Sequence, residues 1–551
     1  MRKKGIFFVC ALLPLLLLTP AITQGLILDS RITDSLSAQN YNEYENSNGM
    51  PLETVISRRM SIRDFKDTPV PVELLLKVLW AAYGYSWRGR VIPSLSDHPL
   101  RIYVCNASAV YKFVPETNSL VFWKDGDYRE LSGGYTAPIQ LFITYDTNIC
   151  PDVYLANVEA GCPTQTIYLM AAALNLGTVC IGGGLDTDLI IQELSLLDER
   201  PLYKMPLGYP LYSYYQNLVP TSRQSSPELP EIQDSNLSFE DALNSVFSSH
   251  EWSENPITKQ ELSQILWASY GYSYYEDTTE TPSETHRTVP SAGALYPMRI
   301  YAANSSGVYQ YLPEQHTLTR IVAGDRRLSI AQASENSWAS SAPLIIALAW
   351  DDSKIFTEVC TVVESGLITQ NVYMESAAWG LIADWGKADT DEEAVKLALG
   401  LTGETNLHPV SIITIGHPST YLHKAEWDET IYPIKTTTNS TISSFAFDQP
   451  NKRISFDVSG HLETHGFCNV TVPSNLLWGS FSVLINGNPI TTLTQNSNST
   501  HASLHFTYEL SSNLTVDIVG DYVIPEFHTW PSILILMILM FTIIIYKRKN
   551  L

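Results

Sequence analysis

Cysteine is scarce in this chain, with seven among 551 residues. The sequence contains no Cys-x-x-Cys pair and no cysteine and histidine cluster with the spacing of zinc ligands, which argues against a metal centre. Cys10 lies in a segment that we expect to be removed. Of the other six, Cys150 and Cys162 are the closest pair in sequence, and an oxidising exterior would allow a disulfide between them. Buried free thiols are an equal alternative for the rest.

Basic residues are also few, since 34 Lys and Arg stand against 57 Asp and Glu and the net charge is −23. This balance argues against a nucleic-acid partner, because such a partner is bound largely through phosphate contacts to clustered cations. The sequence also lacks a G-x-S-x-G serine motif, a P-loop and a dinucleotide-binding glycine fingerprint. These absences leave the common hydrolase and nucleotide-binding signatures without support.

Long apolar runs mark the two ends of the chain. Three basic residues, an apolar run from Ile6 to Leu18 and small residues up to Gly25 predict a signal peptide over residues 1–25, with an uncleaved anchor as the alternative. Trp530 to Tyr546 is almost wholly apolar and is followed by three basic residues, which predicts a single transmembrane helix over 530–546. We therefore expect a cell-membrane protein with a large extracellular part.

Two further features fit an exported chain. Val523 to Phe527 resembles the Pro-Glu-Phe tail signals of archaeal surface proteins, which implies an archaeal source and processing of the tail. Seven Asn-x-Ser/Thr sequons are typical of a glycoprotein, although such triplets also arise by chance. They begin at Asn106, Asn236, Asn304, Asn439, Asn469, Asn498 and Asn513.

The middle of the chain repeats itself. The stretch from Leu75 to Ser86 recurs from Leu262 to Ser273, and shorter matches follow in the same order, among them Val158–Gly161 with Val363–Gly366. Two homologous domains are therefore expected at 53–218 and 237–422, joined by a Ser/Pro-rich linker at 219–236. We call them the first domain and the second domain.

Each domain alternates short β-branched strands with helical segments. Residues 101–105 and 139–145 are typical of strands, and residues 164–176 predict a helix that ends at Gly177. That helix is apolar nearly all round, so it needs another surface to cover it, which a second copy of the domain would supply. Residues 435–523 alternate apolar and polar side chains, with a turn at Asn486–Gly487, and predict an all-β sandwich stalk, with carbohydrate binding as the alternative.

Two segments carry the candidate chemistry. In the first domain, three arginines and a serine (Arg58, Arg59, Ser61 and Arg63) suit a phosphate monoester, although a basic surface turn is an equal reading. In the second domain, Pro290, Ser291, Ala292 and Gly293 are small residues that would let a flat ring approach the backbone, unless they form an ordinary tight turn.

Together these segments resemble the nitroreductase superfamily, and within it the branch that includes the azoline-oxidising dehydrogenases of thiazole/oxazole-modified peptide pathways. The resemblance implies an α+β fold, with both copies meeting as an intramolecular pseudo-dimer. It also implies that the Arg/Ser motif grips the phosphate and ribityl chain of FMN. The Pro-Ser-Ala-Gly segment then reaches the flavin from the partner domain, and a glycine loop, here Gly182, Gly183 and Gly184, lies against the ring.

The two copies depart from the family pattern in complementary ways. The first keeps the Arg/Ser motif and the glycine loop, but its Pro-Ser segment has become Pro93 to Pro99, with Asp97 and His98. The second keeps Pro290–Pro297, but its phosphate motif has become Ser248 to Trp252, with His250 in the place of Arg63. Because each flavin site needs one contribution from each copy, we expect one composite site.

The function that follows is an extracellular, membrane-anchored, FMN-dependent oxidoreductase acting on a small molecule or a modified peptide. Tyr296 is the candidate catalytic residue, as a proton donor or acceptor, with simple packing in the interface as the alternative. Further association beyond the pseudo-dimer is left open. The second hypothesis is a non-catalytic cell-surface protein, used for binding or structure, with a vestigial flavin site.

Overall fold

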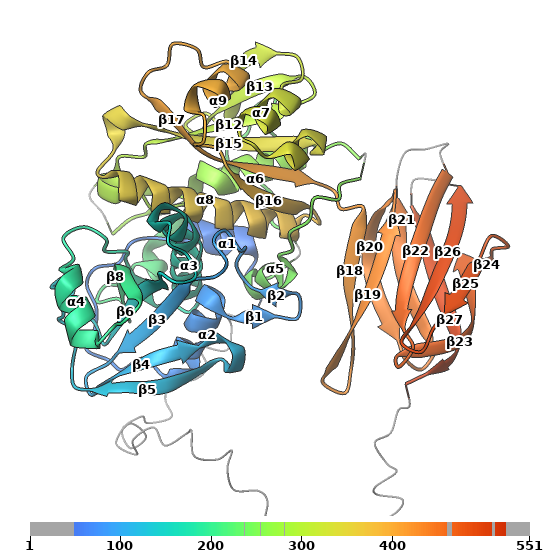
Figure 1. The fold of residues 1–551 in the computed structure, drawn as a ribbon, viewed down its shortest axis with the longest axis horizontal. Coiled ribbons are helices and arrows are strands. Elements are labelled where there is room, and N and C mark those ends of the chain that lie inside the picture. Colours follow the sequence, from blue (N-terminus) through green and yellow to red (C-terminus); the bar gives the residue numbers. More distant parts are fainter. Residues whose placement is uncertain are drawn as a thin grey trace, which may run out of the picture.

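The computed structural model describes residues 49–235, 237–253, 255–279, 282–459, 465–509 and 513–524. The predicted signal peptide at 1–25 and the predicted transmembrane helix at 530–546 lie outside these ranges. Within them, no helix combines the length and the apolar character that crossing a bilayer requires. Figure 1 shows two α+β domains stacked on each other, with a β-sandwich beside them.

The first domain is built around a six-stranded antiparallel sheet in the order β5-β4-β3-β6-β8-β7. Its central strands are buried along nearly their whole length, as the apolar runs at 101–105 and 139–145 predicted. Its helices are α1 (Leu52–Arg58), α2 (Val72–Tyr83), α3 (Val153–Ala173) and α4 (Thr187–Leu194). The strands are β3 (Leu100–Cys105), β4 (Ala109–Val114), β5 (Ser119–Asp125), β6 (Ile139–Asp146), β7 (Gly177–Thr178) and β8 (Glu199–Gly208), and a small hairpin pairs β1 (Tyr85–Ser86) with β2 (Gly89–Arg90).

The second domain repeats this plan, with its six strands in the equivalent order β14-β13-β12-β15-β17-β16. The strands are β12 (Met298–Asn304), β13 (Gly307–Leu312), β14 (Thr317–Ala323), β15 (Leu344–Asp351), β16 (Ile382–Lys387) and β17 (Leu407–Gly416). The helices are α5 (Phe239–Ser245), α6 (Lys259–Tyr270), α7 (Arg327–Ala333), α8 (Glu358–Ala378) and α9 (Glu392–Leu399). The predicted linker opens as strand β9 (Leu218–Pro220), which joins β10 (Tyr272–Asp277) and β11 (Glu284–Arg287) in a small sheet.

Helices α3 and α8 are equivalent in the two domains and lie against each other (Figure 1). They approach most closely at a pair of glycines. A Cβ atom on Gly161 would lie 2.2 Å from the carbonyl oxygen of Val363, and one on Gly366 would lie 1.9 Å from that of Val158. The side chain of Gln165 on α3 also donates a hydrogen bond of 2.9 Å to Asn371 on α8. One apolar core therefore runs through both domains, and each helix covers the other as expected.

The predicted helix at 164–176 is wrong in its bounds. Helix α3 begins eleven residues earlier at Val153, is capped by Asp152 and passes through Pro163 before it ends at Ala173. An interior proline removes a helical hydrogen bond, so a start after Pro163 is what local rules favour. Burial of the whole segment between the sheet and α8 outweighs that cost.

The suggested disulfide is not formed, because all six cysteines of the described chain are free thiols. Cys150 precedes α3, whereas the Cys162 thiol faces the second domain and donates to the Gly366 carbonyl at 3.5 Å. The two side chains thus belong to different surroundings.

The carboxy-terminal region is a sandwich of two five-stranded sheets, as predicted. It begins earlier than residue 435, because β18 (Thr420–Trp427) pairs with β19 (Thr430–Thr438). At the predicted turn, Asn486 and Gly487 have φ angles of 49° and 79°, the left-handed values of a tight hairpin. The other strands are β20 (Thr441–Asp448), β21 (Arg453–Ser459), β22 (His465–Pro473), β23 (Leu477–Ile485), β24 (Asn488–Pro489), β25 (Thr494–Ser497), β26 (His501–Glu509) and β27 (Leu514–Val523).

Candidate functional site

A cavity of about 350 Å³ lies at the junction of the two domains. The first domain lines it with the segment after α1 and the loop after β7, and the second domain with the segment before β12 and the first turns of α8. A volume of this size is within the range of cofactor sites. The cavity brings together eight of the predicted residues: Ser61, Arg63, Gly182, Gly183, Pro290, Ser291, Ala292 and Gly293.

A second cavity of about 420 Å³ adjoins the first and shares five lining residues with it: Ser61, Arg63, Pro290, Ser291 and Gly293. Arg59 and Tyr296 line only this second cavity. The second cavity is also lined by Glu284 and by Asp277, which is paired with His286 at 3.2 Å. The two cavities thus adjoin each other at Ser61, Arg63 and the segment around Pro290.

Arg59 is a buried arginine that does not use all of its hydrogen-bond donors. Its side chain is 2% exposed, and its Nε and Nη2 atoms donate to the carbonyl of Arg287 at 3.3 and 3.0 Å. Its Nη1 atom is buried and has no hydrogen-bond partner among the described residues. No carboxylate of the described chain forms an ion pair with Arg59. Burial lowers the pKa of its guanidinium group, because the charged form loses its hydration. A buried cation without a counter-ion is costly, so this position favours an anionic ligand.

Ser61 and Arg63 reach the cavity because the chain after α1 is extended. Ile62 lies between them, is fully buried and donates its backbone N–H to the Thr178 carbonyl at 2.9 Å. Alternate residues of an extended segment point in opposite directions, so Ser61 and Arg63 face away from the core. The Ser61 hydroxyl lies 3.3 Å from the Tyr168 hydroxyl, and Arg63 is exposed at the cavity.

The structure does not bring Arg58 or Gly184 to the cavity. The Arg58 guanidinium donates to Asn175 at 2.9 Å and lies 5.1 Å from the centre of the Tyr215 ring, so α1 turns it toward the domain interior. Gly184 has a φ of 75° and faces open space. Both residues were predicted because they are close in sequence to residues that do line the cavity. The direction of the backbone points them elsewhere.

Neither the backbone conformation nor the packing of the protein requires glycine at positions 182 and 183. Neither has a positive φ angle. A Cβ atom on Gly182 would meet only Tyr203 at 3.8 Å, and one on Gly183 only Phe356 at 3.5 Å, which are ordinary contacts. Both residues are exposed at the cavity. Their small size therefore keeps the cavity wall open to a close-fitting ligand.

The segment Pro290–Gly293 is held in place by hydrogen bonds to its own domain. Ser291 donates its hydroxyl to a carboxylate oxygen of Glu364 at 2.7 Å and accepts the backbone N–H of Tyr296 at 3.0 Å. Gly293 has a φ of 62°, a left-handed conformation that favours glycine. The segment is thus a fixed turn whose backbone faces the cavity.

Tyr296 is half-buried and lines the second cavity through a ring that packs against two neighbouring side chains. Its ring packs edge-on against Tyr270 at 6.0 Å, and the Arg287 guanidinium lies 4.6 Å from its centre. Burial raises the pKa of its hydroxyl. These contacts favour the packing role that the sequence left open.

Glu364 lines the first cavity and was missed by the sequence analysis. Its side chain is 2% exposed and receives hydrogen bonds from Ser291 and from the Tyr270 hydroxyl. Burial raises the pKa of its carboxyl to about 7. The repeated Val-Glu-x-Gly pattern was a signal for it, but that pattern served only to align the two copies.

The surfaces that would form a second, symmetric site are occupied by protein contacts. His250 pairs with Asp384 at 2.5 Å and stacks on Trp338, with 4.0 Å between ring centres. Isolated bridges join Phe65 to Pro210 and Trp252 to Pro418, so His250 stands where Arg63 stands in the first domain. A histidine and carboxylate pair thus replaces the exposed arginine.

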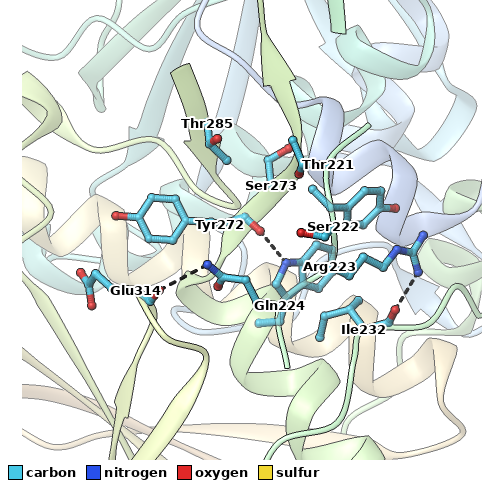
Figure 2. A pocket seen from close by; sticks show the side chains of 11 residues that line it. Thr221, Ser222, Arg223, Gln224, Ile232, Tyr272, Ser273, Thr285 and Glu314 are labelled. Atoms are coloured by element: carbon cyan, nitrogen blue, oxygen red, sulfur yellow. Dashed lines mark hydrogen bonds between the residues drawn. The ribbon is translucent and has the colours of Figure 1, made fainter. Parts of the chain in front are cut away.

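A separate cavity of about 360 Å³ lies beneath the linker in the second domain (Figure 2). Arg223 donates to the Ile232 carbonyl at 2.8 Å, and Gln224 donates to the Glu314 carbonyl (Figure 2). Arg223 also pairs with Asp234 at 2.8 Å. The two Arg223 contacts lie within the linker, whereas the Gln224 hydrogen bond joins the linker to the second domain. None of the predicted site residues lines this cavity.

Comparison with known proteins decides the family. The model of the nitroreductase family matches residues 56–209 and 248–417, which is more than half of the chain. The chain belongs to the nitroreductase family. Members are generally flavin oxidoreductases, so the nitroreductase domains are of an oxidoreductase type. The two matched regions correspond to the two sequence repeats, which confirms a tandem duplication.

Individual relatives agree with the nitroreductase assignment. A nitroreductase-family protein of Methanocaldococcus jannaschii is 34% identical over 180 residues, covering 28% of this chain and 90% of that protein. A crystal structure from Anabaena variabilis is 14% identical, with a TM-score of 0.51, and covers 68% of this chain and 99% of its own. Another, from Desulfovibrio desulfuricans in complex with FMN, is 18% identical with a TM-score of 0.26 and covers 33% and 87%. The Anabaena likeness shows a shared fold across both nitroreductase domains.

Proposed function

We propose that this chain is an FMN-dependent oxidoreductase whose two nitroreductase domains form an intramolecular pseudo-dimer with one flavin site. The observation that carries the proposal is the cavity of about 350 Å³ lined by both domains. Arg59 lines the adjoining cavity, and its buried Nη1 atom has no hydrogen-bond partner among the described residues, so an anionic ligand would be favoured there. Membership of a family of flavin enzymes supplies the class of ligand.

The lining residues fit such a ligand part by part. Arg59 and Arg63 would hold the phosphate, because forked guanidinium groups suit phosphate oxygens. Ser61 would bind the ribityl chain. The flat ring would lie between the Gly182–Gly183 loop of the first domain and the Pro290–Gly293 turn of the second. Arg58 and Gly184 are left out of this set.

The bound flavin would supply hydride or electron transfer, and the protein positions the reactants around it. Backbone N–H groups of Gly182 and Gly183 would stabilise negative charge on the reduced ring. Phe356 and Val359 are exposed hydrophobic residues on the cavity wall, so a substrate with an apolar face would be retained there. A small molecule or a modified peptide remains the proposed substrate class.

We further propose that the enzyme is anchored in the cell membrane and faces outward. Support comes from the sequence alone, through the segments at 1–25 and 530–546 and the sequons. An outward location makes a nicotinamide donor scarce. A reductant or oxidant at the cell surface is then the proposed redox partner.

The test compares two neighbouring arginines. Arg59→Gln should lower the affinity for FMN about 100-fold, because it removes a charge-assisted contact worth roughly 3 kcal/mol from a buried position. Arg58→Gln is the matched control, since Arg58 faces Asn175 and Tyr215, and it should bind FMN like the parent chain. Visible absorption and fluorescence titration of the purified protein measure both. A parent protein that is colourless and cannot be reconstituted with FMN would support the vestigial, non-catalytic alternative instead.

A further inference from the structure

Glu364 is a buried carboxyl group on the wall of the flavin cavity. It lies inside α8, and its side chain is 2% exposed. Tyr270 donates its hydroxyl to one carboxyl oxygen at 2.5 Å, and Ser291 donates to the other at 2.7 Å. Among the residues that the structure describes, no lysine, arginine or histidine forms an ion pair with it. Its hydrogen-bond partners among side chains are thus neutral hydroxyl groups.

The equivalent residue of the first domain, Glu159, has different surroundings. It receives the backbone N–H groups of Leu95 and Ser96 at 3.0 and 2.8 Å and lies 3.3 Å from His98. Burial alone would raise its pKa, but His98 and these N–H groups hold it below the usual value. Glu159 is therefore an ionised structural anchor, whereas the loop of the second domain offers Glu364 no such partners.

The nearest positive charge that faces Glu364 is Arg287, whose charge favours the ionised carboxyl but is outweighed by burial. From β11, Arg287 pairs with Glu314 at 3.1 Å and stacks on the rings of Tyr270 and Tyr296. Across the cavity, the first domain presents Arg63, Tyr168 and Cys180. On its own helix, the Cys360 thiol lines the same wall one turn earlier. Burial in these surroundings raises the carboxyl pKa to about 7, so both protonation states are accessible near neutral pH.

We propose that Glu364 carries the proton in the two-electron reaction of this site, an inference that rests on the proposed flavin function. In the reducing direction, with a quinone as an example of the acceptor, the bound flavin would supply a hydride and the Glu364 carboxylic acid would give its proton to a quinone oxygen. The products would be the hydroquinone, the oxidised flavin and the Glu364 carboxylate, so two electrons and two hydrogens would be transferred. Ser291 orients the carboxyl group, since it donates to Glu364 and accepts from the Tyr296 backbone.

The experiment uses the full chain loaded with FMN, as the parent and as Glu364→Gln and Glu159→Gln. Bound flavin is reduced with dithionite without oxygen and mixed with para-benzoquinone or with ferricyanide, and the return of visible absorbance is followed. Glu364→Gln should slow the quinone reaction roughly 100-fold below neutral pH and remove its pH dependence near 7. Ferricyanide takes electrons without protons, so its reaction should keep the parent rate. Glu159→Gln should behave like the parent with both oxidants.

A second measurement does not depend on flavin. In the flavin-free full chain, one component of the protonated-carboxyl infrared absorption should disappear as the pH rises through about 7, and this titrating component should be missing in Glu364→Gln but not in Glu159→Gln. Glu375, whose pKa burial also raises, contributes a separate component that both variants keep. A parent-like quinone rate and pH profile in Glu364→Gln would overturn the proposal, as would equal slowing with both oxidants. If the parent chain takes up no FMN, the proposed function itself is wrong. If Glu364→Gln binds FMN and its quinone reaction keeps the pH profile of the parent, only the proposed role of Glu364 is wrong.

Discussion

At the scale of single residues, the site depends on how three neighbouring arginines are turned. Arg59 is buried at the second cavity and Arg63 is exposed at both cavities, whereas Arg58 contacts Asn175 and lines neither. The Nε atom of Arg58 also lacks a hydrogen-bond partner among the described residues, so an unused donor alone does not distinguish Arg59 from Arg58. Charge density alone cannot distinguish them, because each carries the same group. The direction of the backbone after α1 decides which of them can meet an anion.

Arg63 and His250 occupy equivalent positions and should respond differently to truncation. Arg63→Ala should weaken FMN binding by about 1.5 kcal/mol, the lower end for a charged hydrogen bond, since Arg63 is exposed. His250→Ala should leave FMN affinity unchanged, because His250 is engaged with Asp384 and Trp338. Equilibrium titration of the two variants measures this difference. Equal losses from both would mean that two sites bind flavin.

The contiguous parts of the site could be predicted from sequence. Ser61, Arg63 and Pro290–Gly293 lie in short motifs whose residue types already suggest a phosphate and a flat ring. Glu364 could not be predicted from such a motif, because it lies within a buried helix. It differs from Glu159 only in the three-dimensional structure, where the neighbouring loop of the second domain offers it no histidine and no backbone N–H group. The unused donor of Arg59 likewise depends on tertiary contacts.

At the scale of secondary-structure elements, the crossing of α3 and α8 fixes how the two domains meet. The apolar pattern of 164–176 predicted that a second surface must cover this helix. The true helix is longer, because packing overrides the local effect of Pro163. The strands of the sheets and of the sandwich were easier to predict, since alternation and β-branched runs are local signals.

The glycine pair at this crossing gives a prediction opposite to helix propensity. Alanine in place of glycine inside a helix is expected to stabilise it by about 1 kcal/mol. Gly366→Ala should instead lower the free energy of unfolding by about 3 kcal/mol, because the new Cβ would meet the Val158 carbonyl and force the helices apart. Denaturant unfolding measures the change, and Gly161→Ala should show a similar loss. A gain in stability in either variant would show that the helices do not cross closely.

At the scale of the whole molecule, duplication within one chain lets the two copies of a domain diverge. One junction keeps an open cavity with arginines, whereas the equivalent elements on the other side hold His250 against Asp384 and Glu159 against His98. A homodimer has to carry the same residues at both of its sites. A single chain with two copies can use one site for a cofactor and the other for packing.

The number of FMN molecules bound per chain tests this account most directly. The flavin-free full chain is titrated with FMN, and the bound cofactor is counted from its visible absorbance against the protein concentration. One composite site predicts saturation at one FMN per chain. Saturation at two, or no saturable binding, would contradict the claim that the two domains build a single flavin site between them.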